Sequence, residues 1–453
     1  MSSAVRSPAA AAAASVVVAM AAAWASPPRA AGQTAAPRGR AGGQDIAAVA
    51  EAIGRIVALG DEQVDYARVE LELAALFDKA VHVGDSLAEV DRMARALRRR
   101  LMPTRTSPLA AQTKVGAMAN YVFEVERIGA AAVHTPAAPT LLHELLRDRR
   151  GTDHALAILY LALARRVGMP LKLVPSHGHV FVRYESDGQT YDIELTAKGR
   201  ITPAGHQRKK LRQPDARCYL QPLPPSQAVA LILARMGDWL RMRGRYREAL
   251  LCLEASLRRR PGQPEALVTR GTCLSAIGRH AEGLKCAEQA IRLYAPYSRA
   301  WTNRAACLAN VGRRAESLAS YAKAIELDPN CPGARVGRGM ATFDMGKPRQ
   351  ALVDYYHVLR KIDNRHAPAW LHASRALERL GDHRRALICA RQATDAEPRN
   401  PLNWLWHGYA ACEAGRLDEA RRCARRLGAM GAAPLEKRLR AKIARPASRP
   451  ATR

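Results

Sequence analysis

Asp153, His179 and Glu194 are the residues whose types and spacing could support chemistry. Asp153 stands at the start of a long apolar run. His179 opens a later segment with strand character, and Glu194 lies in the strand-like segment that follows. Carboxylate and imidazole side chains are the groups that general acid–base chemistry most often uses. Asp192 is the alternative to Glu194, because residues two apart point to the same face of a strand.

A metal site is a second interpretation of these segments. His177 and His179 form one i, i+2 pair, and Asp192 and Glu194 form another, so each pair could place two ligands on one strand face. Such pairs arise easily by chance, and we expect neither a metal nor a cofactor.

The elements that must position these residues can be read from the same stretch. Gly151-Thr-Asp is a helix-start signal, and residues 155–164 are apolar almost all round, which predicts a helix enclosed by protein. Gly168 and the following Pro170 end that helix. Segments 171–174, 179–184 and 191–195 then predict a small antiparallel sheet with a turn at 187–188. Upstream, apolar residues at helical spacing predict helices over 46–57, 69–77, 87–101 and 115–128.

This order of elements resembles the transglutaminase-like core, which belongs to the papain-like cysteine-enzyme architecture, over roughly residues 64–201. Closest is a bacterial group in which the core is joined to tetratricopeptide repeats. The resemblance implies a Gly-x-Cys helix start, a His at a strand start and an acidic residue on the next strand that orients the His. His179 fits the second role and Glu194 the third, with Asp192 as the alternative. The first position holds Asp153 instead of Cys.

The missing cysteine bears directly on activity. A helix N-terminus beside a His stabilises a thiolate, which is the nucleophile of acyl transfer, whereas a carboxylate there is a poor one. All nine cysteines fall at Cys218 or later. We therefore expect cysteine-type catalysis to be lost and Asp153 to serve as a helix cap. The alternative is an active peptide- or isopeptide-processing enzyme that uses Asp153, His179 and Glu194 in an altered mechanism.

A repeat array follows the core. Glycines recur at spacings of 34, 34, 34, 35 and 34 residues, at Gly244, Gly278, Gly312, Gly346, Gly381 and Gly415. Each unit predicts two helices with the glycine in a left-handed turn between them, and small residues recur five positions later. The pattern resembles tetratricopeptide repeats, which implies an α-solenoid whose groove binds another protein or peptide.

The repeat sequence also suggests which residues face the groove. The carboxylate-clamp pattern is not evident, since Val268, Thr272, Gly333 and Gly337 stand where cationic or amide side chains would be expected. Four residues could instead form a basic stretch of groove and are our candidate binding residues: Arg299, Asn303, Arg335 and Arg338.

The expected organisation has five parts. Residues 1–25 resemble a signal peptide with an Ala-x-Ala cleavage signal, and 26–44 form a flexible linker. A transglutaminase-like α+β domain spans 45–220, six repeats span 226–433 after a proline-rich hinge at 221–225, and a basic tail spans 434–453. We expect a mainly α, periplasmic or secreted protein with no membrane span beyond the leader. Unpaired cysteines argue the other way, for the cytoplasm if the leader is not cleaved.

The net charge of the chain does not indicate which class of partner it binds. The formal net charge of the 453 residues is +30, carried mainly by arginine, and such a surface attracts acidic partners of any class. Arginine and alanine are enriched together, which indicates a compositional bias, and no nucleic-acid-binding motif accompanies them. We do not expect nucleic acid as the partner.

Overall fold

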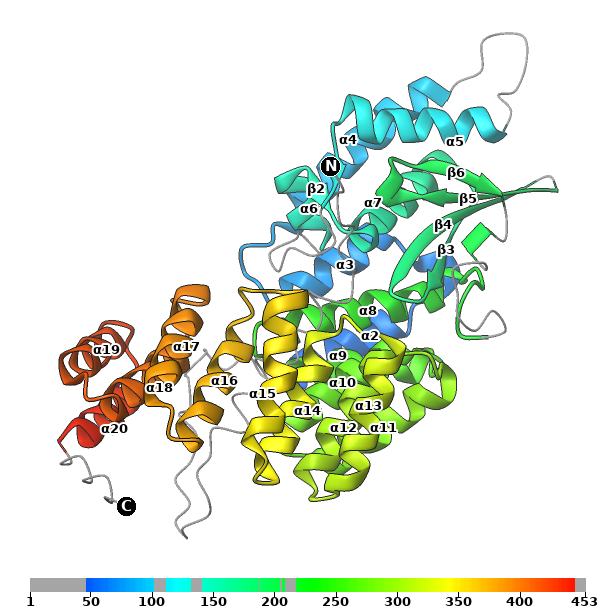
Figure 1. Cartoon of the computed structure of the whole chain (residues 1–453). Coiled ribbons are helices and arrows are strands. Elements are labelled where there is room, and N and C mark those ends of the chain that lie inside the picture. Colours follow the sequence, from blue (N-terminus) through cyan, green and yellow to red (C-terminus); the bar gives the residue numbers. More distant parts are fainter. Residues whose placement is uncertain are drawn as a thin grey trace, which may run out of the picture. The chain divides into compact units, whose positions relative to one another are not determined.

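The computed structural model describes residues 46–101, 111–131, 141–186, 188–203, 206–207 and 217–444. The chain is mainly α, with one small β-sheet in its first half (Figure 1). Contacts divide it into two compact units, one ending at Ala300 and the other beginning at Trp301. The expected signal peptide and linker, and the last residues of the expected basic tail, lie outside the described residues.

Helices form the first part of the unit that ends at Ala300. They are α2 (Ile46–Val57), the short 3-10 helix η1 (Asp61–Gln63), α3 (Tyr66–Ala75), α4 (Val83–Leu101), α5 (Ala111–Asn120), the π-helix η2 (Tyr121–Val125) and α6 (Leu142–Asp148). The helix predicted over 115–128 is shorter than expected. It changes to a π-turn at Tyr121 and ends at Val125, and Arg127 has a left-handed φ of 53° that no helix can continue.

The predicted central helix is α7 (Asp153–Val167). Its side chains are buried from His154 to Ala164, and it packs against α3, α4 and the first two strands of the sheet. Gly168 ends it with a φ of 72°, as its position in the sequence predicts. The all-round apolar pattern therefore identified the helix at the centre of this unit.

The sheet is antiparallel in the order β3-β4-β5-β6. Its strands are β3 (Leu171–Ser176), β4 (His179–Ser186), β5 (Gln189–Glu194) and β6 (Arg200–Pro203), and the 3-10 helix η3 (Leu195–Ala197) joins the last two. Three of these strands were predicted. The fourth, β6, was missed because Ile201 is its one strongly apolar residue. A separate parallel pair, β1 (Gly129–Ala130) with β2 (Arg150–Gly151), holds the chain just before α7.

The first helix pairs of the repeat array share a core with this unit. They are α8 (Pro225–Met242) with α9 (Tyr246–Arg259), and α10 (Pro264–Ala276) with α11 (His280–Leu293). One continuous hydrophobic cluster extends from Val49 in α2 to Cys286 in α11. The segment expected to act as a hinge is bonded to the sheet, because the Leu223 N–H donates to the Leu173 carbonyl over 2.8 Å.

The remaining helices continue the array. They are α12 (Ser298–Asn310), which contains the division between the units, α13 (Arg314–Leu327), α14 (Pro332–Asp344), α15 (Pro348–His357) with the π-turn η5 (Val358–Ile362), α16 (Ala367–Arg379), α17 (His383–Ala396), α18 (Pro401–Glu413), α19 (Leu417–Ala429) and α20 (Ala433–Ile443). All six predicted turn glycines have φ between 71° and 86°, and Gly431 adds a further such turn before α20. The repeats and their turns are thereby confirmed.

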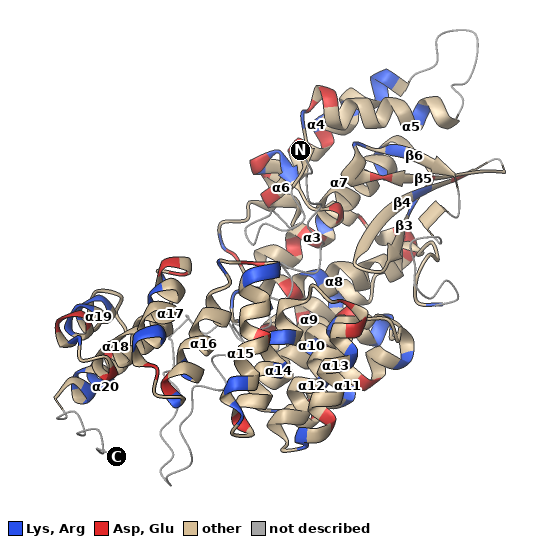
Figure 2. Cartoon of the chain, viewed as in Figure 1, with Lys and Arg blue, Asp and Glu red and all other residues tan. Residues whose placement is uncertain are grey.

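Basic and acidic residues are interspersed along the helices (Figure 2). One ion pair recurs directly after the turn glycine, where an arginine meets a glutamate three residues later at 2.5 to 2.6 Å; the pairs are Arg245–Glu248, Arg279–Glu282 and Arg313–Glu316. Part of the positive charge is therefore neutralised locally. Within the described ranges, no helix is both long and apolar enough to cross a membrane.

Candidate functional site

The three residues singled out from the sequence meet in the first unit. Asp153 is the first residue of α7, His179 is the first residue of β4 and Glu194 is the last residue of β5. Their side chains are 17%, 25% and 7% exposed. The end of the central helix and two neighbouring strands therefore bring together groups that lie up to 41 residues apart in the sequence.

The imidazole of His179 lies between the two carboxylates. Its Nδ1 is 2.8 Å from Asp153 Oδ2, and its Nε2 is 2.5 Å from Glu194 Oε1. A carboxylate accepts hydrogen bonds, so both ring nitrogens must carry a proton to satisfy these contacts. The geometry therefore favours an imidazolium held between two anions.

The charges around His179 also favour its imidazolium form. Burial disfavours the charged form of His179, but the hydrogen bonds to Asp153 and Glu194 outweigh it and raise the pKa of His179 to about 9. Burial opposes ionisation of Asp153 as well, yet the bond to His179 and the charge of Arg235 lower the pKa of Asp153 to about 2. At neutral pH the site holds a cation and its anionic partners.

Asp153 does more than cap a helix. Thr152 occupies the N-cap position and makes no side-chain cap hydrogen bond. Asp153 Oδ1 accepts from the His154 N–H at 2.8 Å, and Oδ2 accepts from the Val180 N–H at 2.9 Å in addition to its contact with His179. The carboxylate thus joins α7 to β4, which the expectation of a simple cap did not include.

Gln207 completes the site, and the sequence did not indicate it. Its Nε2 donates to Glu194 Oε2 over 2.8 Å, and the residue is 2% exposed. In the sequence the residue stands beside Arg208, Lys209 and Lys210. The amide orients the carboxylate that in turn holds His179. One buried polar residue within a charged run carries no periodic signal that could have marked it.

Asp192 and His177 contact other residues and not His179. Asp192 is 1% exposed and binds Arg183, its neighbour on β4, at 2.6 and 3.2 Å, whereas His177 contacts Tyr219. Glu194, not Asp192, therefore contacts His179. Among the residues that the structure describes, no three His, Cys, Asp or Glu side chains gather closely enough to hold a metal ion. The two i, i+2 pairs do not come together as the metal interpretation requires.

Buried polar atoms surround the start of α7. Thr152 Oγ1, His154 Nε2, Glu70 Oε1 and Arg235 Nε are shielded from solvent and have no hydrogen-bond partner within the described chain. Burial lowers the pKa of His154 to about 3 and raises the pKa of Glu70 to about 8, so both are largely neutral near pH 7. Arg235 of α8 interacts electrostatically with Glu70, Asp153 and His154.

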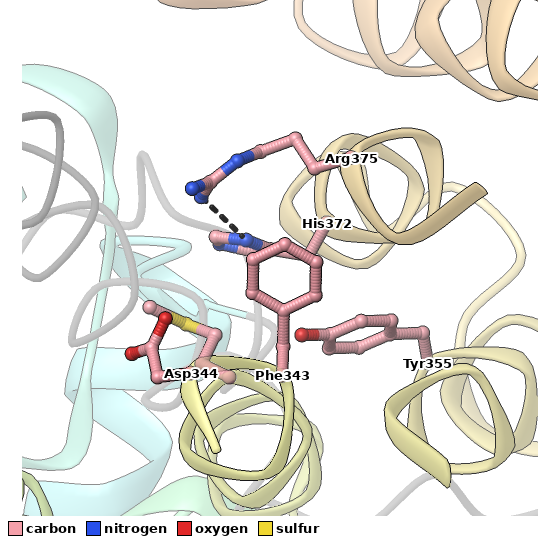
Figure 3. Close-up of a pocket in the computed structure, with 6 residues that line it drawn as sticks. Phe343, Asp344, Tyr355, His372 and Arg375 are labelled. Carbon is pink, nitrogen blue, oxygen red and sulfur yellow. Dashed lines mark hydrogen bonds between the residues drawn. The ribbon is translucent and has the colours of Figure 1, made fainter. Parts of the chain in front are cut away.

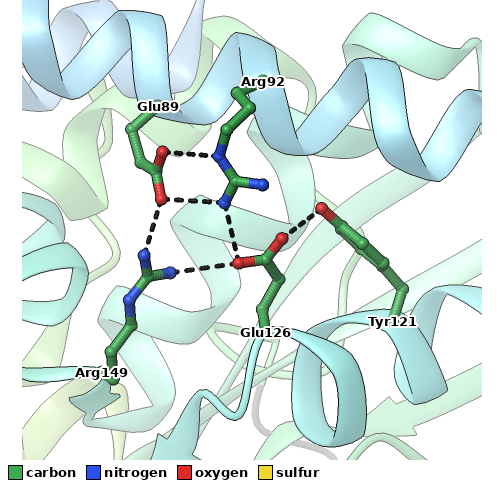
Figure 4. Close-up of polar contacts among 5 residues, drawn as sticks. All are labelled: Glu89, Arg92, Tyr121, Glu126 and Arg149. Carbon is green, nitrogen blue, oxygen red and sulfur yellow. Dashed lines mark hydrogen bonds and ion pairs between the residues drawn. The ribbon is translucent and has the colours of Figure 1, made fainter.

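A network of charges holds the chain that leads into α7 (Figure 4). Arg149 binds Glu89 at 2.7 Å and Glu126 at 3.3 Å, and Arg92 binds the same two carboxylates at 2.8 Å each. Tyr121 donates to Glu126. The bonds to Arg92 lower the pKa of Glu89 to about 2. Arg149 has a left-handed φ of 51°, and this network secures that conformation four residues before Asp153.

The native cysteines are mostly buried thiols. All nine are free, and each is buried except the half-buried Cys412. Burial raises the pKa of Cys218, the first in the chain, to about 11, and its Sγ contacts the Leu293 carbonyl. It is therefore a protonated thiol at neutral pH.

The predicted basic groove is partly neutralised. Arg338 binds Asp354 through two nitrogens at 2.6 and 2.8 Å, and Arg335 lies 4.0 Å from the same carboxylate. Asn303 is 2% exposed within α12, the helix that also carries Arg299. Binding of a partner by these four residues stays a prediction.

A small pocket in the second unit offers a different set of groups (Figure 3). Its lining comprises Met340, Phe343, Asp344, Tyr355, His372 and Arg375. Arg375 Nη1 lies 3.4 Å from His372 Nδ1, and its guanidinium lies over the rings of Phe343 and Trp406, 5.5 and 4.8 Å from their centroids. Arg375 also interacts electrostatically with Asp344 and Glu378. The second unit therefore has a cation framed by aromatic rings.

Comparisons with known protein families find two kinds of match. Residues 85–236 match the transglutaminase-like superfamily model, and residues 235–283, 298–331 and 371–434 match tetratricopeptide repeat models. The chain contains a transglutaminase-like domain followed by tetratricopeptide repeats.

The chain is also similar in part to curated proteins and to solved structures. UPF0162 proteins of two Xylella fastidiosa strains, 9a5c and Temecula1, are each 28% identical over 170 residues, which is 35% of this chain and 60% of theirs. A tetratricopeptide repeat protein of Thermus thermophilus is 17% identical, with a TM-score of 0.39, over 40% of this chain and 99% of that one. PilF of Pseudomonas aeruginosa is 17% identical, with a TM-score of 0.39, over 48% of this chain and 99% of that one.

Proposed function

We propose that this protein is an exported scaffold in which a transglutaminase-like domain without cysteine-type catalysis is joined to repeats that dock another protein. The observation that carries the first part is the double contact of His179. In cysteine-type acyl transfer, a thiolate attacks and the imidazole beside it shuttles a proton. Here a carboxylate fills the nucleophile position, and both ring nitrogens face carboxylates. An imidazole whose pKa is about 9 already carries its proton at neutral pH, so it is not available to accept one as a general base.

An activity assay tests this part. Full-length protein would be incubated with acyl-amide and peptide substrates that cysteine hydrolases and transglutaminases accept, next to His179→Ala as the control. We expect the wild type to show no turnover above the variant. Turnover that disappears in His179→Ala would contradict the proposal.

That contradictory result would support the second candidate, an enzyme with an altered Asp153–His179–Glu194 mechanism. One observation favours it: strongly shifted pKa values in a partly open site often mark catalysis. His179 remains 25% exposed, and its imidazolium could donate a proton to a leaving group. Loss of turnover on Glu194→Gln as well as His179→Ala would assign the activity to this site.

Docking by the repeats rests on Arg375 and its aromatic neighbours. Tetratricopeptide arrays bind extended segments along the first helices of their pairs, and α16 and α18 are such helices. A photo-crosslinking residue in place of Trp406, on α18, should capture a partner in the native host. The same residue in place of Val353, which is 69% exposed on the second helix of its pair, is the control. Equal capture from both positions would contradict docking along the first helices.

Export is proposed from the leader alone. The apolar run that ends in Ala23-Trp24-Ala25 resembles a cleavage signal. N-terminal sequencing of protein purified from a native-like host should find a start near Ser26. An intact Met1 or Ser2 on protein from the cytoplasmic fraction would contradict export.

A further inference from the structure

His177 lies in the tight turn between β3 and β4, two residues before His179, and its side chain enters a cage of tyrosines. The ring centroids of Tyr294 and Tyr297 lie 4.7 and 4.8 Å from that of His177, and the centroid of Tyr219 lies 5.8 Å away. The three tyrosines are 1%, 5% and 2% exposed, in that order. At these separations the ring contacts are favourable beyond simple burial. Contacts with these tyrosines, which lie outside the sheet, therefore hold the turn in place.

A chain of hydrogen bonds also sets the orientation of the His177 ring. The Tyr219 hydroxyl donates to Glu265 Oε1 over 2.6 Å, so its oxygen is left to accept from His177 Nδ1, 3.1 Å away. Burial alone would raise the pKa of Glu265, but the bonds from His177 and Tyr219 lower it, so the carboxylate at the end of the chain is ionised. His177 is consequently fixed in ring orientation as well as in position.

Two of the three cage tyrosines and Glu265 belong to the repeats, whereas the turn belongs to the transglutaminase-like domain. Glu265 lies in the first turn of α10, and Tyr294 and Tyr297 follow the end of α11. Tyr219 lies in the segment that pairs with β3, where the Leu220 N–H donates to the Pro175 carbonyl over 2.8 Å. All of these residues lie in the unit that ends at Ala300. The second helix pair of the array thus reaches the turn that carries His179.

We propose that His177 is a positioning residue through which the α10–α11 helix pair holds His179 between Asp153 and Glu194. The backbone from His177 to His179 passes through Gly178, whose φ is 67°, so the turn has little intrinsic stiffness. His179 contacts its two carboxylates at 2.8 and 2.5 Å, and such contacts weaken steeply when a donor moves by an ångström. The cage supplies the rigidity that the turn lacks.

The test measures the pKa of His179 by NMR titration of full-length protein with labelled histidine, with the signal assigned through its loss in His179→Gln. Replacing His177 by Ala empties the cage, and the pKa of His179 should fall from about 9 toward 6.5. Replacing His177 by Phe keeps a ring among the tyrosines, and the pKa should stay close to the wild-type value. A wild-type pKa in His177→Ala would overturn the proposal.

Two further variants keep the test decisive. Tyr297→Leu removes one wall of the cage and should also lower the pKa of His179, which covers the case in which His177→Ala does not fold. Leu274→Ala removes a fully buried side chain from the same helix pair, outside the cage. This variant should leave the pKa of His179 unchanged. If Leu274→Ala lowers the pKa as much as His177→Ala, the effect is general loosening, and the specific role of His177 is wrong. Because the readout is a pKa, the result does not depend on the proposed absence of catalysis.

Discussion

The Nδ1 atom of His179 lies 2.8 Å from the carboxylate of Asp153, the residue that the resemblance matches to the cysteine of the transglutaminase-like family. We propose that the position of a nucleophile is kept while its chemistry is changed. Substitutions at Asp153 and at His179 can test this charge pair.

Asp153→Cys should create an unusually reactive thiol. The helix N-terminus and the neighbouring imidazolium both favour a thiolate, so the thiol pKa should fall below the reference of about 8.5. Peptide-resolved alkylation near neutral pH measures this, and the nine native cysteines serve as a slow internal background. Adding His179→Ala should slow the reaction at position 153. A thiol no faster than an exposed model thiol, and indifferent to His179→Ala, would show that the site does not resemble a cysteine site electrostatically.

The charge on His179 should make stability depend on pH. Its pKa is raised from 6.5 to about 9 in the folded protein, so its stabilising effect is complete below pH 6.5 and is lost as the pH rises through 9. Asp153, whose pKa is lowered from 3.8 to about 2, contributes above pH 3.8 and loses its effect as the pH falls through 2. The pair therefore stabilises most between about pH 4 and 6.5.

Denaturant unfolding of the wild type and His179→Asn measures that effect. The difference in unfolding free energy between them should shrink by on the order of 3 kcal/mol between pH 6 and pH 10, since each pKa unit corresponds to about 1.4 kcal/mol. His82→Asn, at an exposed residue, is the control and should show no such trend. A constant difference for His179→Asn across this range would mean that His179 is not an imidazolium in the folded state.

Glu70→Gln should stabilise the protein at neutral pH. Burial raises the pKa of Glu70 from 4.5 to about 8, so the folded protein holds a proton that the unfolded chain releases, and stability falls as the pH rises between these values. A neutral amide avoids that cost, and the gain at pH 7 should be on the order of 3 kcal/mol. Glu72→Gln, at an exposed residue of the same helix, should change little. A destabilised Glu70→Gln at pH 7 would show that the carboxylate is ionised and paired.

Gly312→Val should destabilise the repeats through backbone strain alone. A Cβ at Gly312 meets no atom within 4 Å, but its φ of 84° is strongly disfavoured for a β-branched residue. The cost should exceed that of Gly262→Val by about 2 kcal/mol, because a Cβ at Gly262 also has open space and its φ is not left-handed. Equal melting curves for the two variants would contradict the role of the turn.

The features found from the sequence are those that local pattern determines. The apolar run of α7, the turn glycines and the strands that carry His179 and Glu194 each follow from residues close together in the chain. The contacts of Asp153 and Glu194 with His179 followed in outline, because the start of α7, the start of β4 and the end of β5 meet.

The features that were missed depend on distant partners. Gln207 stands in a charged run, and nothing near it in sequence indicates that its amide reaches Glu194. Asp192 and Glu194 share a strand face, yet Arg183 on the neighbouring strand binds the first and leaves the second for His179. The tyrosine cage joins residues 177 and 297. Such pairings are decided by tertiary packing, which periodicity does not report.

The division of the chain within α12 has a consequence for how this protein can vary. The helix pairs before it share a core with the transglutaminase-like domain, so their number is constrained by the site they support. The pairs after it pack mainly on their neighbours and meet through the same left-handed glycine turn. Whole pairs could be duplicated or deleted there with a single new junction to accommodate. Related chains should therefore differ in length mostly downstream of residue 300, in steps close to 34 residues.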